Sequence, residues 1–120
     1  MEKKKYNISV EATLEVIGGK WKCVILCHLI NGKKRTSELK RLMPNISQKM
    51  LTQQLRELEE SGVVDRTFYH ELPPKVEYEL SEYGHSLEAI LHALCNWGET
   101  HIIKTYGNKE EYLEKSILNE

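Results

Sequence analysis

Residues 47–61 combine regularly spaced leucines with polar and basic side chains, as a helix with one buried and one exposed face does. Leu51, Leu55 and Leu58 fall at positions i, i+4 and i+7, which turns them inward. The side chains that then project outward are Gln48, Lys49, Thr52, Gln53 and Arg56. Glutamine can hydrogen-bond adenine, and arginine or lysine can bond guanine or phosphate. The pattern therefore predicts a helix, capped by Ser47, that enters the major groove of a double-stranded DNA.

Further basic and hydroxyl side chains flank this helix and are expected to bind phosphates. One group, Lys33, Lys34, Arg35 and Ser37, precedes and opens a short helix, whose N-terminal N–H groups favour an anion. A second group lies in a predicted hairpin, with Arg66 and Lys75 expected at its base and His70 near its tip. We expect the hairpin to touch the DNA backbone near Pro73, with a solvated turn as the alternative.

The charge is distributed unevenly along the 120 residues. Seventeen Lys and Arg against 18 Asp and Glu give a net charge of -1, which argues against a uniformly basic nucleic-acid binder. Residues 20–66, however, carry a net +5 and residues 67–120 a net -6. One positive face on an otherwise acidic domain is therefore expected, and a solvated mixture of charges without a functional face is the alternative.

Apolar periodicity and turn residues predict the elements that position these groups. Helices are expected after Ser9 up to Gly18-Gly19, from Trp21 to Asn31-Gly32, from a cap at Thr36 or Ser37 to Pro44, and over 47–61. Strands at 63–69 and 75–80 flank a loop with Pro73 and Pro74, and helices at 81–106 and 109–118 follow. The expected fold is mainly α with a small β-hairpin (α+β), a winged helix-turn-helix with terminal dimerisation helices.

Several motifs in this order resemble the HxlR-type winged helix-turn-helix regulators of the MarR-like superfamily. The motifs are Ile17-Gly18-Gly19-Lys20-Trp21, Ile25-Leu26, Arg35-Thr36-Ser37-Glu38-Leu39, Ile46-Ser47-Gln48-Lys49-Met50-Leu51-Thr52, Leu55-Arg56-Glu57-Leu58-Glu59, Gly62-Val63-Val64 and Pro73-Pro74-Lys75-Val76-Glu77-Tyr78-Glu79-Leu80. The resemblance covers residues 8–106 and implies a homodimeric, bacterial transcription regulator. Two-fold symmetry then predicts a palindromic operator with half-sites about one helical turn apart, or a multiple of that. We expect repression.

The domain expected at 8–106 includes the long helix, with an N-terminal arm at 1–7 and a helical tail at 107–120. The apolar stripe of the long helix exceeds what one small domain covers, so it predicts a dimer interface. The expected interface residues are Leu14, Leu87, Ile90, Leu91, Leu94 and Trp97. The alternative is that the stripe packs wholly within its own domain.

The cysteines and histidines predict no metal site, cofactor or enzyme activity. Cys23, Cys27 and Cys95 form no C-x-x-C pair and are interpreted as small buried side chains of a reducing compartment. Two thiols and His28 are too few for zinc, and no nucleophile–base or phosphate-loop pattern is present. Oxidant-sensing members of the resembled family carry a cysteine before the first helix, where this chain has Ile8 and Ser9.

Two further functions remain open beside DNA binding. A winged-helix scaffold could serve as a protein-interaction module through its acidic C-terminal part, and Cys23, Cys27 or Cys95 could serve a thiol-based redox sensor. No apolar run reaches the length of a membrane span, and no signal-peptide core follows the N-terminus. A cytoplasmic location is therefore expected.

Overall fold

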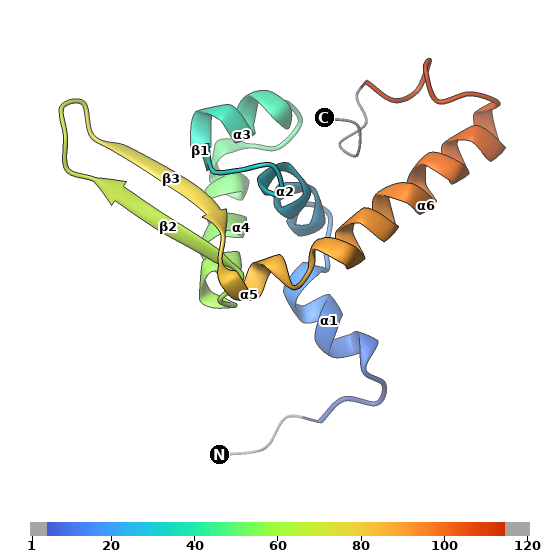
Figure 1. The fold of residues 1–120 in the computed structure, drawn as a ribbon, viewed down its shortest axis with the longest axis horizontal. Coiled ribbons are helices and arrows are strands. Elements are labelled where there is room, and N and C mark those ends of the chain that lie inside the picture. The colour runs from blue at the N-terminus through green and yellow to red at the C-terminus, as the bar shows by residue number, and fades with distance from the viewer. Residues whose placement is uncertain (1–4, 115–120) are drawn as a thin grey trace.

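The computed structural model describes residues 5–114 as a small helical body with a projecting hairpin and a projecting long helix (Figure 1). The elements are α1 (Val10–Ile17), α2 (Lys22–Leu29), β1 (Lys34–Arg35), α3 (Thr36–Leu42), α4 (Gln48–Glu60), β2 (Val64–Tyr69), β3 (Lys75–Leu80), α5 (Glu82–His85) and α6 (Glu88–Tyr106). Helices α2, α3 and α4 are followed by the hairpin of β2 and β3, and this order confirms the predicted winged helix-turn-helix.

The sheet has three antiparallel strands in the order β1-β3-β2. The hairpin of β2 and β3 pairs Val64 with Leu80 at its base and Tyr69 with Lys75 beside the loop. The stretch before α3 was expected as a plain basic connector, but Lys34 pairs with Tyr78 as part of strand β1. Two residues are too few to show the alternation of a strand, so the sequence gives no sign of β1. The strand is defined only by its pairing with the edge of β3.

The core lies between α2, α3, α4 and the base of the hairpin. Leu51, Leu55 and Leu58 are buried, which confirms the predicted inner face of α4. They pack with buried side chains of the other elements, namely Ile25, Leu26, Leu29, Leu39, Ile46, Val63, Val64 and Leu91. Each such aliphatic side chain contributes roughly 1.5–3 kcal/mol by leaving water, so this core fixes the orientation of α4.

Caps set the ends of the helix-turn-helix. Ser47 Oγ accepts the N–H of Met50 at 3.0 Å, as predicted for the start of α4, and Gly62 ends the helix with φ +82°. The predicted cap of α3 at Thr36 or Ser37 is wrong by one or two residues. Arg35 occupies the cap position, and the Glu38 carboxylate accepts its N–H at 2.8 Å.

The single helix predicted over residues 81–106 is interrupted after His85. Ser81 Oγ accepts the N–H of Gly84 and its hydroxyl donates to Gly62 O at 2.6 Å, which ties α5 to the base of the hairpin. Gly84 lies so close to Val63 that a Cβ would come within 2.0 Å of its carbonyl oxygen. α6 packs instead on α2, and Figure 1 shows its C-terminal half leaving the body. The break separates elements with different packing partners.

The helix predicted at 109–118 is absent from its described part. Gly107, with φ +94°, ends α6, and residues 108–114 form turns in which Leu113 N–H donates to Lys109 O at 2.8 Å. Residues 115–118 lie outside the described residues, as does part of the arm expected at 1–7. None of the helices between residues 5 and 114 combines the length and the apolarity that a membrane span needs.

Candidate nucleic-acid interface

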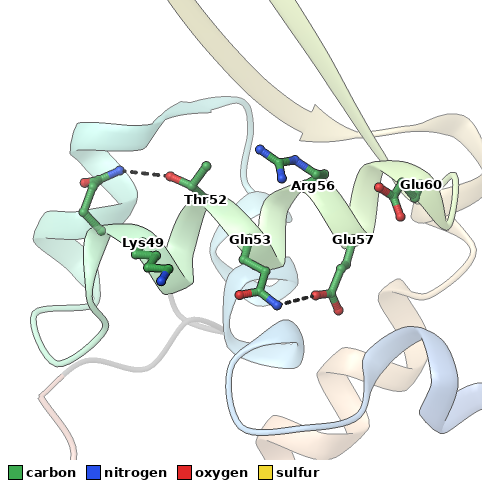
Figure 2. Close-up of a pocket in the computed structure, with 7 residues that line it drawn as sticks. Lys49, Thr52, Gln53, Arg56, Glu57 and Glu60 are labelled. Carbon is green, nitrogen blue, oxygen red and sulfur yellow. Dashed lines mark hydrogen bonds between the residues drawn. The ribbon is translucent and has the colours of Figure 1, made fainter.

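The outer face of α4 gathers the side chains that the sequence pattern singled out (Figure 2). They line an open hollow of about 730 Å³ made by Gln48, Lys49, Thr52, Gln53, Arg56, Glu57 and Glu60. The first five are exposed and sit opposite the buried leucines. A hydrated polar face on a rigidly packed helix can exchange water for base edges or phosphates without refolding.

Glu57 belongs to this face, and the sequence interpretation missed its contacts. Its Oε1 lies 2.8 Å from Lys22 Nζ of α2, and its Oε2 accepts a hydrogen bond from Gln53 Nε2 at 3.2 Å. The hydrogen bond from Lys22, then that from Gln53 and the charge of Lys22, lower the pKa of Glu57. Spacing at i, i+4 could have indicated the Gln53 contact, whereas nothing local links Lys22 to α4.

A second hollow joins α4 to the hairpin. It measures about 340 Å³ and is lined by Thr52, Arg56, Glu59, Arg66 and Tyr78. Arg56 and Arg66 thus border one concave surface although they come from different elements. A phosphate at this junction would meet two guanidinium groups, which suit phosphate oxygens because of their planar fork of donors.

The hairpin differs from the prediction in the position of Lys75. Lys75 was expected at the base with Arg66, but it pairs with Tyr69 directly beside the loop. Its Nζ lies 4.7 Å from the centroid of the Tyr69 ring and 3.7 Å from Glu71 Oε1. The cation therefore belongs to the tip, near the exposed His70, whose ring meets Phe68 edge-on at 4.6 Å.

The basic stretch before α3 is held against the hairpin. Lys33 Nζ donates to the Tyr69 hydroxyl at 3.5 Å and lies 3.9 Å from Glu77. The Tyr69 hydrogen bond and the nearby negative charges, Glu77 and Glu79 among them, raise the pKa of Lys33, which keeps it cationic. Lys34 is partly buried, whereas Arg35 and Ser37 are exposed where α3 begins. These groups lie beside the wing, not on α4.

The expected interface residues separate into two sets. Leu14, Ile90, Leu94 and Trp97 remain exposed, Trp97 to 69%, and Leu87 is partly buried. Leu91 is fully buried in the chain's own core, so its assignment to an interface is wrong. Exposed apolar side chains also follow α6 outward, at Ile103 and Tyr106, and precede Leu14 at Ile8 and Val10.

The cysteines meet across the α2–α6 contact. Cys27 Sγ lies 3.7 Å from Cys95 Sγ, and Cys23 Sγ donates to Ile17 O at 3.0 Å. Burial, together with the charge and hydrogen bond of Cys95, raises the pKa of Cys27 to about 12, and burial raises that of Cys23. The thiolate is the reactive form, so Cys23 and Cys27 are expected to react slowly. Among residues 5–114, no three His, Cys, Asp or Glu side chains gather as metal ligands.

Comparison with known proteins matches the HxlR-like helix-turn-helix model over residues 16–106. The uncharacterized HTH-type transcriptional regulator YtcD of Bacillus subtilis (strain 168) is 75% identical over 120 residues, which cover 100% of this chain and 95% of YtcD. The oxidized form of the redox regulator HypR is 55% identical with a TM-score of 0.76, over 78% of this chain and 96% of HypR. A putative transcriptional regulator of the MarR family from Enterococcus faecalis V583 is 44% identical with a TM-score of 0.70. The match covers 81% of this chain and 88% of that protein.

Proposed function

Because the chain belongs to the HxlR-like helix-turn-helix family, we propose that it is a transcriptional regulator that binds double-stranded DNA sequence-specifically. The observation that carries the proposal is the exposed polar face of α4, in which Gln48, Lys49, Thr52, Gln53 and Arg56 line one hollow. Helix-turn-helix proteins insert this second helix into the major groove. The face offers amide donors and acceptors for base edges and cations for phosphates.

The proposed DNA contacts extend to either side of α4. Arg66, His70 and Lys75 of the hairpin would follow the adjacent backbone, and Lys33, Lys34, Arg35 and Ser37 would bind phosphates beside it. Ser47 would contribute a backbone contact while it caps α4. These groups position the protein, and the helix face reads the sequence.

The proposed active form is a homodimer on a palindromic operator. The exposed apolar residues of α1 and α6 support it, because such side chains gain free energy when a second copy covers them. Leu14, Ile90, Leu94 and Trp97, with Leu87 at the edge, would form the shared surface. Residues 8–106 would act as the regulatory domain, with 1–7 and 107–120 as appendages. Occupying a promoter excludes polymerase, so repression is the proposed outcome.

Fluorescence anisotropy with duplexes from upstream of its own gene tests the proposal. At ~0.1 M salt we expect binding of one duplex well above that of its scrambled version. The double variant Gln53→Ala, Arg56→Ala should lose about 30-fold or more of this preference, since it removes two base contacts worth ~1–3 kcal/mol each. Lys109→Ala, beyond the end of α6, is the control and should bind like the wild type. Equal binding of all duplexes would refute sequence-specific recognition.

Two alternatives make different predictions in the same assays. A protein-interaction module would show only weak DNA affinity and would hold a partner protein independently of salt. A thiol-based redox sensor would lose or gain operator affinity on oxidation, and the 3.7 Å approach of Cys27 and Cys95 is the observation that favours testing it. We propose instead that DNA binding is indifferent to mild oxidation, because Cys27 is buried between α2 and α6 and burial raises the pKa values of both Cys23 and Cys27.

A further inference from the structure

An ion pair and a hydrogen bond link α2 to the outer face of α4. We call this chain of contacts, from Lys22 through Glu57 to Gln53, the relay. Lys22 has a side chain only 13% exposed, so the packing of α2 restricts where its ammonium group can lie. It meets Glu57 Oε1 at 2.8 Å, and this contact restrains a carboxylate whose side chain is 37% exposed. Glu57 is therefore less free to move than an unpaired surface glutamate.

The second oxygen of Glu57 fixes the orientation of the Gln53 amide. An ionised carboxylate only accepts hydrogen bonds, so the group that faces it must be Gln53 Nε2, at 3.2 Å. Figure 2 shows the Gln53 nitrogen directed toward Glu57 and the amide oxygen directed away from it. The terminal torsion of a free glutamine has a broad, roughly two-fold preference, which would exchange the two atoms easily.

This orientation has a consequence for reading DNA. A carbonyl oxygen that is turned away from Glu57 is left to accept hydrogen bonds, and adenine and cytosine present amino groups for it in the major groove. Guanine and thymine present acceptor oxygens there, which the amide oxygen cannot bond, so that only the second N–H of Gln53 Nε2 is left for them. A freely rotating amide would satisfy either class and would discriminate between them poorly.

Resting on the proposed function, we propose that Glu57 is a positioning residue that presents Gln53 to the duplex as an acceptor. Gln53 then favours a base with an exocyclic amino group at the position it reads. Glu57 itself contacts no base in this account. Its charge, which would otherwise repel phosphates, is partly neutralised by Lys22.

The test compares Glu57→Gln with Glu60→Gln, which removes the same charge from the same hollow. Affinities are measured for operators in which each base pair is replaced in turn. In Glu57→Gln we expect the preference at one base pair per half-site to fall about five- to tenfold, with the other positions unchanged. Glu60→Gln should change affinity for all operators by one common factor. If both variants act uniformly, Glu57 contributes charge only and the inference is wrong.

A measurement on the free protein separates this inference from the proposed function. The side-chain amide resonances of Gln53 should shift as Glu57 is protonated, below the carboxyl's ordinary pKa of 4.5, because Lys22 and Gln53 lower that pKa. The shift should vanish in Glu57→Gln and persist in Glu60→Gln. If the Gln53 amide resonances do not change when Glu57 is protonated or replaced, the inferred contact between the two side chains is wrong. A wild-type protein without any base preference overturns both proposals, whereas uniform variants of a base-selective protein overturn only this one.

Discussion

α4 and α6 both pair a buried face with an exposed one, but their exposed faces differ in chemistry. α4 buries Leu51, Leu55 and Leu58 and presents amides, hydroxyls and charges to solvent. α6 fully buries only Leu91 and leaves Ile90, Leu94, Trp97 and others exposed. A polar face is stable in water and exchanges partners readily, whereas an apolar face gains free energy from lasting burial. We therefore propose DNA as the partner of α4 and a second copy of the chain as the partner of α6.

The largest effect is expected from charging the exposed face of α6. Leu94→Glu combined with Trp97→Glu should produce a monomer, because two carboxylates per chain would be buried in the interface. Operator affinity should fall on the order of 10³-fold, since the second half-site no longer binds as part of one molecule. Analytical ultracentrifugation and anisotropy measure the two effects, and circular dichroism should show an intact fold. A variant that remains dimeric would place the interface elsewhere.

The contact between α2 and α6 leads us to expect slow reaction of the Cys27 thiol. A pKa near 12 for Cys27, against an ordinary 9.0, lowers its thiolate fraction at pH 8 by about 10³-fold. Reaction with a thiol reagent should be slower by about that factor than for the same protein unfolded in urea. Its rate should rise about tenfold per pH unit between pH 7 and 9. Rapid labelling of Cys27 in the folded protein would show that the α2–α6 contact opens.

A smaller effect is expected where the basic residues beside the wing meet phosphates. Arg35→Ala should reduce the slope of log affinity against log salt by ~0.9 per lost contact, and a dimer loses two contacts. Sequence preference should remain, because phosphate contacts carry no base information. Lys109→Ala, beyond the end of α6, serves as the control with an unchanged slope. A change in base preference without a change in slope would place Arg35 in base reading.

The smallest expected effect concerns the ion pair that links α2 to α4. Glu57 has a lowered pKa in the folded state, so its stabilising contribution is present above pH 4.5 and is lost as the pH falls through the lowered value. Lys22→Met should therefore lower the urea midpoint slightly at pH 7, and the difference should shrink by pH 3. Lys49→Met, an exposed change of the same charge, is the control. An undiminished difference at pH 3 would mean that the lysine acts through packing.

The features that the sequence predicted are those with a strong local signal. The leucine spacing of α4, the Ser47 cap and the loop prolines depend on neighbouring residues, so the helix α4 and the hairpin were correctly predicted. Leu91 and its exposed neighbours share one apolar stripe, and only the packing of α6 on α2 separates them. The break after His85 depends on Val63 and Gly62, which are distant in sequence. Lys75 was predicted at the base of the hairpin, but it is the first residue of β3. Because the chain reverses at the loop, the first residue of β3 lies beside the loop and opposite Tyr69.

Sequence reading by the outer face of α4 is the proposal on which the others depend. Selection from a pool of random duplexes at ~0.15 M salt, followed by sequencing of the bound fraction, tests it most directly. We expect enrichment of one palindromic motif with half-sites about one helical turn apart, or a multiple of that, and loss of this motif with Gln53→Ala, Arg56→Ala. Recovery of unenriched sequences by the wild type, or of the same motif by the double variant, would contradict it.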